Sequence, residues 1–171
     1  MKSFLAMSFA TLVLASPAWA EDKPAEVPDM SKMGPWSRKP TDEKRIKKEI
    51  DAFLEQVDEV FKKRDFEASL GMIDFPLYWA TDNSKGMGHT ELLDRVKWTA
   101  MQKPFYENMP KDTEMTHKFT VVVLSDAMAT GTDDYVLSTG KDKFAGRGAF
   151  LLVKRDGQWK WKVMSEAGWG E

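Results

Sequence analysis

His117 and the carboxylates Asp82 and Asp133 are the side chains of this sequence best suited to acid–base chemistry. His117 shares one face of an expected strand with the apolar residues Met115 and Phe119. An imidazole on such a face acts as a general base when burial or a carboxylate partner, here Asp82 or Asp133, tunes it. The alternative is a histidine of the core or of a sheet edge that hydrogen-bonds only to the backbone.

Asp133 and Asp134 are adjacent in another expected strand, so side-chain alternation turns only one of them inward. Tyr135 lies on the same side as Asp133. A buried carboxylate near His117 would be a functional candidate, and Asp133 and Tyr135 are then ligand-binding residues. The alternative is a pair of exposed aspartates on the convex face of a sheet.

The elements that position these residues follow from periodicity and turn signals. Apolar residues at steps of three and four predict a first helix that begins after Thr41 or Asp42. A second helix follows Asp65, residues 76–82 predict a strand, and residues 89–103 predict a third helix. Strands are then expected at 114–124, 127–139 and 143–155, followed by a last strand. The order is helix, helix, strand, helix and a four-stranded antiparallel meander.

The last strand carries tryptophan at alternate positions in the segment RDGQWKWKVMSEAGW, residues 155–169. Asp156-Gly157 predicts a tight hairpin turn before it. Strict alternation places one set of side chains on a single buried face: Trp159, Trp161, Val163, Ser165, Ala167 and Trp169.

The first twenty residues have the composition of a secretory signal peptide. A basic Lys2 precedes an apolar run, and Ala18-Trp19-Ala20 fits a small-x-small cleavage site. The run is too short for a stable membrane anchor, so we expect a periplasmic or secreted protein. Residues 21–40, rich in proline and charge, predict a flexible leader before a single domain over residues 41–171.

Composition excludes several classes of function. A net charge of −2 leaves no basic excess for nucleic acid. The chain has no cysteine and only two histidines, which are not spaced for zinc, so we expect no metal site. No phosphate-binding loop or dinucleotide fingerprint occurs, and we expect no cofactor.

Three segments in this order resemble a known superfamily. They are FKKRDF at the end of the first helix, the turn NSKGMG, and the run GRGAFLLVKRDGQWKWKVM. Together they make residues 41–170 similar to the nuclear transport factor 2-like superfamily, particularly its SnoaL-like and ketosteroid isomerase-like members. The resemblance implies an α+β fold in which a cone-shaped, curved antiparallel sheet wraps around three helices and encloses an internal pocket.

The resemblance also implies positions for site residues. Asp82, or Thr81 one step off, fills the position of the isomerase general base, but Val57 stands where that family has an oxyanion-hole tyrosine. The second oxyanion acid is missing around Gly148 or Ala149, so the ketosteroid isomerase mechanism is disfavoured. In the first strand, Tyr78 and Asp82 share a face, and we expect this face to line the pocket.

Trp169, beyond the small residues Ala167 and Gly168, is expected at the pocket or its rim. The leading hypothesis is therefore an exported pocket protein that binds a small, partly apolar molecule, with or without catalysis. One alternative is an isomerase- or dehydratase-type enzyme that uses Asp82 and His117. Another is a non-catalytic interaction module, for instance a homodimer formed through the sheet.

Overall fold

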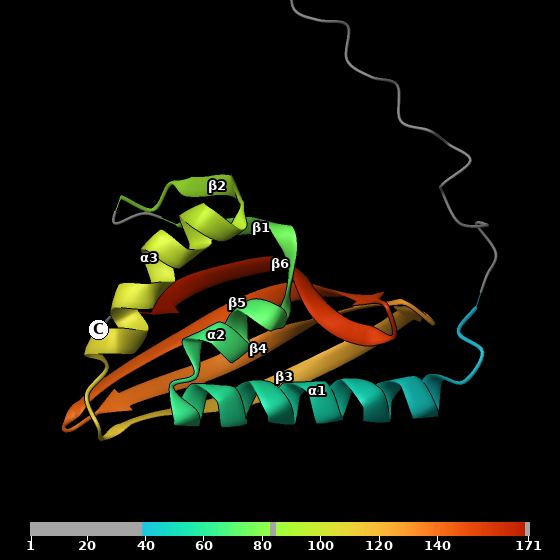
Figure 1. Ribbon diagram of the computed structural model, residues 1–171, viewed down its shortest axis with the longest axis horizontal. Coiled ribbons are helices and arrows are strands. Elements are labelled where there is room, and N and C mark those ends of the chain that lie inside the picture. Colours follow the sequence, from blue (N-terminus) through green and yellow to red (C-terminus); the bar gives the residue numbers. More distant parts are fainter. Residues whose placement is uncertain (1–38, 83–84, 170–171) are drawn as a thin grey trace, which may run out of the picture. The chain divides into compact units, whose positions relative to one another are not determined.

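The computed structural model describes residues 39–82 and 85–169, with side chains through Ala167 (Figure 1). The predicted signal peptide and nearly all of the predicted leader lie outside the described residues. The elements are α1 (Glu43–Lys63), α2 (Phe66–Gly71), β1 (Ile73–Asp82), β2 (Gly88–Leu93), α3 (Arg95–Asn108), β3 (Thr113–Ser125), β4 (Met128–Thr139), β5 (Asp142–Arg155) and β6 (Gln158–Trp169).

An aspartate precedes each helix. The carboxylates of Asp42, Asp65 and Asp94 each accept a hydrogen bond from the backbone N–H three residues further on, at 2.8–3.0 Å. The third cap corrects one expectation, because residues 88–93 form β2 rather than the start of α3. This segment pairs with β1 along its whole length, and sheet pairing there outweighs helix propensity.

The strands form one sheet in the order β2-β1-β6-β5-β4-β3. All neighbours are antiparallel except β1 and β6, which are parallel. The expected meander from β3 to β6 is confirmed, as are the α+β class and the curved sheet with three helices (Figure 1). The helix α1 packs against β3, α2 and β6, and its apolar stripe faces them: Ile46, Ile50, Phe53 and Leu54 are buried.

A β-bulge at Lys162 interrupts the last strand. Trp161 pairs with Leu152 and Val163 pairs with Leu151, so Lys162 has no partner of its own on β5. The extra residue reverses the alternation of side chains. Beyond the bulge Met164 and Glu166 lie on the same side of the sheet as Trp161, and the expectation of one unbroken tryptophan face is wrong past this point.

The side chain of Lys162 fixes the bulge to the start of β1. Its Nζ donates hydrogen bonds to the carbonyl oxygens of Asp74 and Pro76, at 3.1 and 2.8 Å. The same nitrogen lies 3.1 Å from the carboxylate of Asp74. The bulge is therefore a feature held by long-range contacts.

Trp159 and Trp161 belong to the core, which explains their concentration at the end of the chain. The ring of Trp161 lies 5.6 Å from that of Phe53 on α1 and 5.2 Å from that of Phe150 on β5, measured between centroids. These contacts join the helix layer to the sheet. None of the described helices is long and apolar enough to span a membrane.

Candidate functional site

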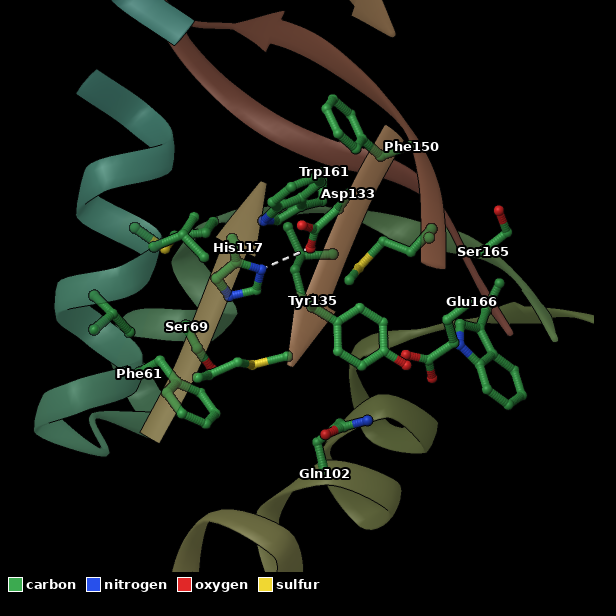
Figure 2. Close-up of a pocket in the computed structure, with 18 of the residues that line it drawn as sticks. Phe61, Ser69, Gln102, His117, Asp133, Tyr135, Phe150, Trp161, Ser165 and Glu166 are labelled. Atoms are coloured by element: carbon green, nitrogen blue, oxygen red, sulfur yellow. Dashed lines mark hydrogen bonds and ion pairs between the residues drawn. The ribbon is translucent and has the colours of Figure 1, made fainter. Parts of the chain in front are cut away.

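A cavity of about 470 Å³ lies between the helices and the inner face of the sheet (Figure 2). Its volume is within the range of sites that bind small molecules. Most of its wall is apolar. The apolar lining residues include Val60, Met72, Trp79, Phe150 and Trp161. Polar side chains gather at two places on this wall.

His117 and Asp133 form the first polar centre. Nδ1 of His117 lies 2.6 Å from Oδ2 of Asp133, and both side chains are largely buried. The register of β3 and β4 pairs His117 with Tyr135 and Phe119 with Asp133. The two residues are therefore diagonal neighbours on one face, where side chains come into contact. The imidazole also stacks on Phe119, with ring centroids 5.0 Å apart.

Asp58 of α1 completes this centre from the helix side. Its Oδ1 lies 3.6 Å from Nε2 of His117, which is longer than a hydrogen bond. Oδ1 of Asp58 and Oδ1 of Asp133 are both buried and accept no hydrogen bond from the protein. A buried acceptor without a donor costs about 1–3 kcal/mol.

Glu166 and Tyr135 form the second polar centre. Figure 2 shows the phenol of Tyr135 directed towards the carboxylate of Glu166, on the side of the cavity away from His117. Burial raises the pKa of Glu166, although the indole N–H of Trp79 acts in the opposite direction. The side chain of Glu166 is exposed where the cavity meets a more open depression, and the protein atoms around it desolvate its carboxyl only in part.

The hydroxyl of Tyr135 reaches this position over a glycine. A Cβ atom at residue 146 would lie 2.3 Å from the phenolic oxygen, so only Gly146 leaves room for the ring. Burial raises the pKa of Tyr135, and the negative charges of Glu166 and Asp133 raise it further. Tyr135 therefore stays a neutral donor between the two polar centres.

The structure places three of the predicted site residues, His117, Asp133 and Tyr135, on the cavity. It also decides between the two adjacent aspartates. Asp134 turns to the outer face, where a nitrogen of Arg147 donates to its carboxylate at 3.0 Å. The arginine holds the pKa of Asp134 below its usual range.

Asp82 does not lie on this cavity. It borders an adjoining, more open depression of about 380 Å³, together with His89 and Arg147, and Glu166 lines both hollows. The structure therefore does not bring Asp82 and His117 together, and the expected pairing of these two residues is wrong. Tyr78 is likewise outside the cavity and 43% exposed.

The reason lies in the alternation of β1. Leu77 is fully buried in the core, and Trp79 faces the cavity two positions later. Tyr78 and Asp82 are the even-numbered residues, so the expected orientation of this strand is reversed. The side chain of Trp169 lies outside the described residues.

Sequence reasoning missed two carboxylates, Glu166 on the cavity and Asp58 beside His117. Asp58 is four residues after Leu54 and three before Phe61, so a charged residue interrupts the apolar stripe of α1. The sequence therefore contained a signal that could have identified Asp58 as a candidate site residue. Glu166 gave no such signal, because strict alternation assigns it to the outer face. The described residues contain no group of three or more His, Cys, Asp or Glu side chains arranged to hold a metal ion.

No protein-family model and no curated protein sequence matches this chain. Solved structures do match it. One is an NTF-2 like protein of unknown function from Shewanella oneidensis, with a TM-score of 0.57 and 18% identity over 71% of this chain and 98% of that one. The chain has the nuclear transport factor 2-like fold.

Two further solved structures are similar to this chain. A putative scytalone dehydratase from Novosphingobium aromaticivorans matches with a TM-score of 0.57 and 13% identity, over 72% of this chain and 84% of that one. LinA matches with a TM-score of 0.58 and 12% identity, over 72% of this chain and 86% of that one. At these identities the likeness shows the fold alone, and it confirms the fold that the sequence resemblance implied.

Proposed function

We propose that this NTF2-like domain binds a small, largely apolar molecule in its cavity and exchanges a proton with it at His117. The observation that carries this proposal is the contact between His117 and Asp133 at 2.6 Å on an otherwise apolar wall. Most of the wall supplies shape and apolar contact, and the few polar groups orient the ligand.

The geometry of His117 assigns a role to each ring nitrogen. An ionised Asp133 accepts the proton of Nδ1 and fixes that tautomer, so Nε2 is the basic nitrogen. Nε2 lies beyond hydrogen-bonding distance of Asp58 and keeps its capacity to take a proton from a ligand. Asp133 then stabilises the imidazolium that forms. General-base catalysis of this kind contributes about 10²–10⁴-fold to a rate.

Two reaction types use such a base. In an isomerase, His117 removes a proton from one carbon and returns it to another. In a dehydratase, it removes a proton from one carbon and returns it to the hydroxyl group that leaves the neighbouring carbon as water. The putative scytalone dehydratase among the similar structures supports the second type. In either case Asp133, and not Asp82, is the partner of the histidine. Binding without turnover is the alternative use of the same cavity.

The variant Asp133→Asn tests catalysis against simple binding. A thermal-shift screen of small apolar ketones, hydroxy compounds and sterols first supplies a ligand, and turnover of that ligand is then measured. Asparagine cannot stabilise an imidazolium, so we expect turnover to fall by about 10²–10⁴-fold with a smaller change in affinity. Asp134→Asn is the matched control, because the adjacent carboxylate faces the outside and pairs with Arg147.

Three results decide the proposal. Collapse of turnover in Asp133→Asn alone supports proton transfer. An equal loss in both variants contradicts it. Ligand binding in the absence of any turnover, unchanged in Asp133→Asn, supports a binding protein instead.

We further infer that residues 1–20 direct export and that the mature chain begins at Glu21 in the periplasm or outside the cell. Intact-mass measurement of the protein from a culture fraction tests this inference. Retention of residues 1–20 would contradict it.

A further inference from the structure

Glu166 is placed in the cavity by the bulge at Lys162, and the proton transfer proposed above does not use it. Its carboxylate faces the indole of Trp79 and the phenol of Tyr135. Both are neutral groups, and no ion pair joins Glu166 to a cation among the described residues. A partly desolvated carboxylate without a cationic partner is costly, and a ligand with a positive charge would supply that partner.

The other charged groups around the cavity reinforce this polarity. His117 on β3 lies between Asp133 on β4 and Asp58 on α1. Even a protonated His117 is outnumbered by these two carboxylates and Glu166. No lysine or arginine occurs among the described residues that line the cavity, and Arg147, which borders the adjoining depression with Glu166, donates a hydrogen bond to Asp134. The field inside the cavity is therefore negative, which repels anions and attracts cations.

The aromatic wall fits the same class of ligand. Trp79 and Tyr135 flank Glu166, and Trp161 and Phe150 continue the wall towards the core. Faces of aromatic rings attract ammonium groups, most strongly where water is excluded. The cavity thus offers a carboxylate that can bind a ligand's ammonium group, and aromatic ring faces that can contact both this group and the apolar part of the ligand.

We propose that Glu166 makes this cavity selective for small apolar or aromatic amines, whose ammonium group it binds between Trp79 and Tyr135. This inference rests on the proposed ligand-binding function and names the class of molecule bound. Such a ligand places its apolar body against Trp161 and Phe150 and reaches towards His117 with its other end.

Three probes with one indole ring test this selectivity: tryptamine carries an ammonium, tryptophol a hydroxyl, and indole-3-acetate a carboxylate. Isothermal titration calorimetry at neutral pH measures each affinity. We expect tryptamine to bind about tenfold or more tighter than tryptophol, and indole-3-acetate to bind weakest. In Glu166→Gln the preference for tryptamine over tryptophol should disappear.

Glu55→Gln is the matched control, because it removes one negative charge from an exposed position on α1 that lines neither the cavity nor the adjoining depression. It should keep the preference for tryptamine. A second measurement needs no variant: tryptamine should lower the pKa of the Glu166 carboxyl in the wild-type protein, followed by NMR, whereas tryptophol should not.

Equal affinities for tryptamine and tryptophol would overturn the selectivity but leave the ligand-binding cavity standing. Persistence of the preference in Glu166→Gln, or its loss in Glu55→Gln, would overturn the assignment to Glu166. Absence of tryptamine binding at millimolar concentration would overturn the inference. The proposed proton transfer is decided separately, by Asp133→Asn.

Discussion

Asp133 holds His117 from the neighbouring strand, with 2.6 Å between Oδ2 and Nδ1. The contact is diagonal across β3 and β4, so the sheet register itself sets its geometry. Asp58 approaches the other ring nitrogen from α1 at 3.6 Å, a distance that depends on how the helix packs on the sheet. Asp133 therefore lies within hydrogen-bonding distance of the histidine, whereas Asp58 acts on it through its charge alone.

We predict that Asp58→Asn lowers turnover of a substrate much less than Asp133→Asn does. The separation of 3.6 Å gives no direct hydrogen bond, so Asp58 contributes through its charge. We expect a loss of roughly tenfold or less for Asp58→Asn, against about 10²–10⁴-fold when the support of the base is removed. Steady-state kinetics of both variants, with folding checked by circular dichroism, measures the difference. Equal losses would show that His117 depends on both carboxylates.

Truncation of Trp161 tests the core beneath the cavity. The side chain is buried against Phe53 and Phe150, and we predict that Trp161→Ala destabilises the domain by about 3–5 kcal/mol. Chemical denaturation measures the free energy of unfolding. Val96→Ala is the control, because Val96 is 77% exposed on α3 and its truncation should change stability by less than about 0.5 kcal/mol. A shift below about 1 kcal/mol for Trp161→Ala would contradict the packing described for this ring.

Sequence periodicity correctly predicted which side chains share a face where a strand contains no bulge. In β3 and β4 it put Asp133 and Tyr135 on one face, and the structure places both on the cavity with His117. It could not decide the inward face of β1, because that choice depends on Leu77 packing into the core. Tyr78 offered the more attractive hydrogen-bonding group, and burial of apolar surface nevertheless set the orientation.

The bulge at Lys162 is a second feature that the local sequence pattern could not predict. Lys162 at the bulge interacts with Asp74 and Pro76, which are more than eighty residues away in sequence. No property of the segment WKWKVMSE reports that contact. Glu166 was therefore assigned to the wrong face, and the second polar centre of the cavity escaped detection.

We predict that Lys162→Met destabilises the domain by about 1–3 kcal/mol, because two carbonyl oxygens and the Asp74 carboxylate lose their donor. Relaxation of the bulge would also turn Glu166 away from the cavity and weaken ligand binding. Denaturation and calorimetric titration of the same variant measure both effects. Unchanged stability and affinity would show that the bulge does not depend on this lysine.

The loss of stability in Lys162→Met should depend on pH, because Lys162 interacts with the carboxylate of Asp74. Burial raises its pKa, but the hydrogen bond and charge of Lys162, with help from Arg155, outweigh burial and lower the pKa overall from 3.8. A carboxyl with a lowered folded pKa stabilises the protein above its ordinary pKa and loses that contribution as the pH falls through the folded value. The gap in stability between wild type and Lys162→Met should therefore narrow below pH 3.8.

Glu166→Gln should change stability in the opposite direction, because it should stabilise the domain at neutral pH, where Lys162→Met destabilises it. Burial raises the folded pKa of Glu166 above 4.5, the value expected in the unfolded chain, so ionisation costs stability in the folded state. That cost is absent below 4.5 and grows as the pH rises through the folded pKa. Glutamine has nearly the same shape as glutamate but carries no negative charge at this position. We therefore predict that Glu166→Gln has a higher Tm than wild type at neutral pH and nearly the same Tm in acid. Calorimetric scans across this range, without ligand, measure the difference. A Tm difference that does not change with pH would show that Glu166 is as well solvated in the folded protein as in the unfolded chain, and would remove the desolvated carboxylate on which its selectivity for amines depends.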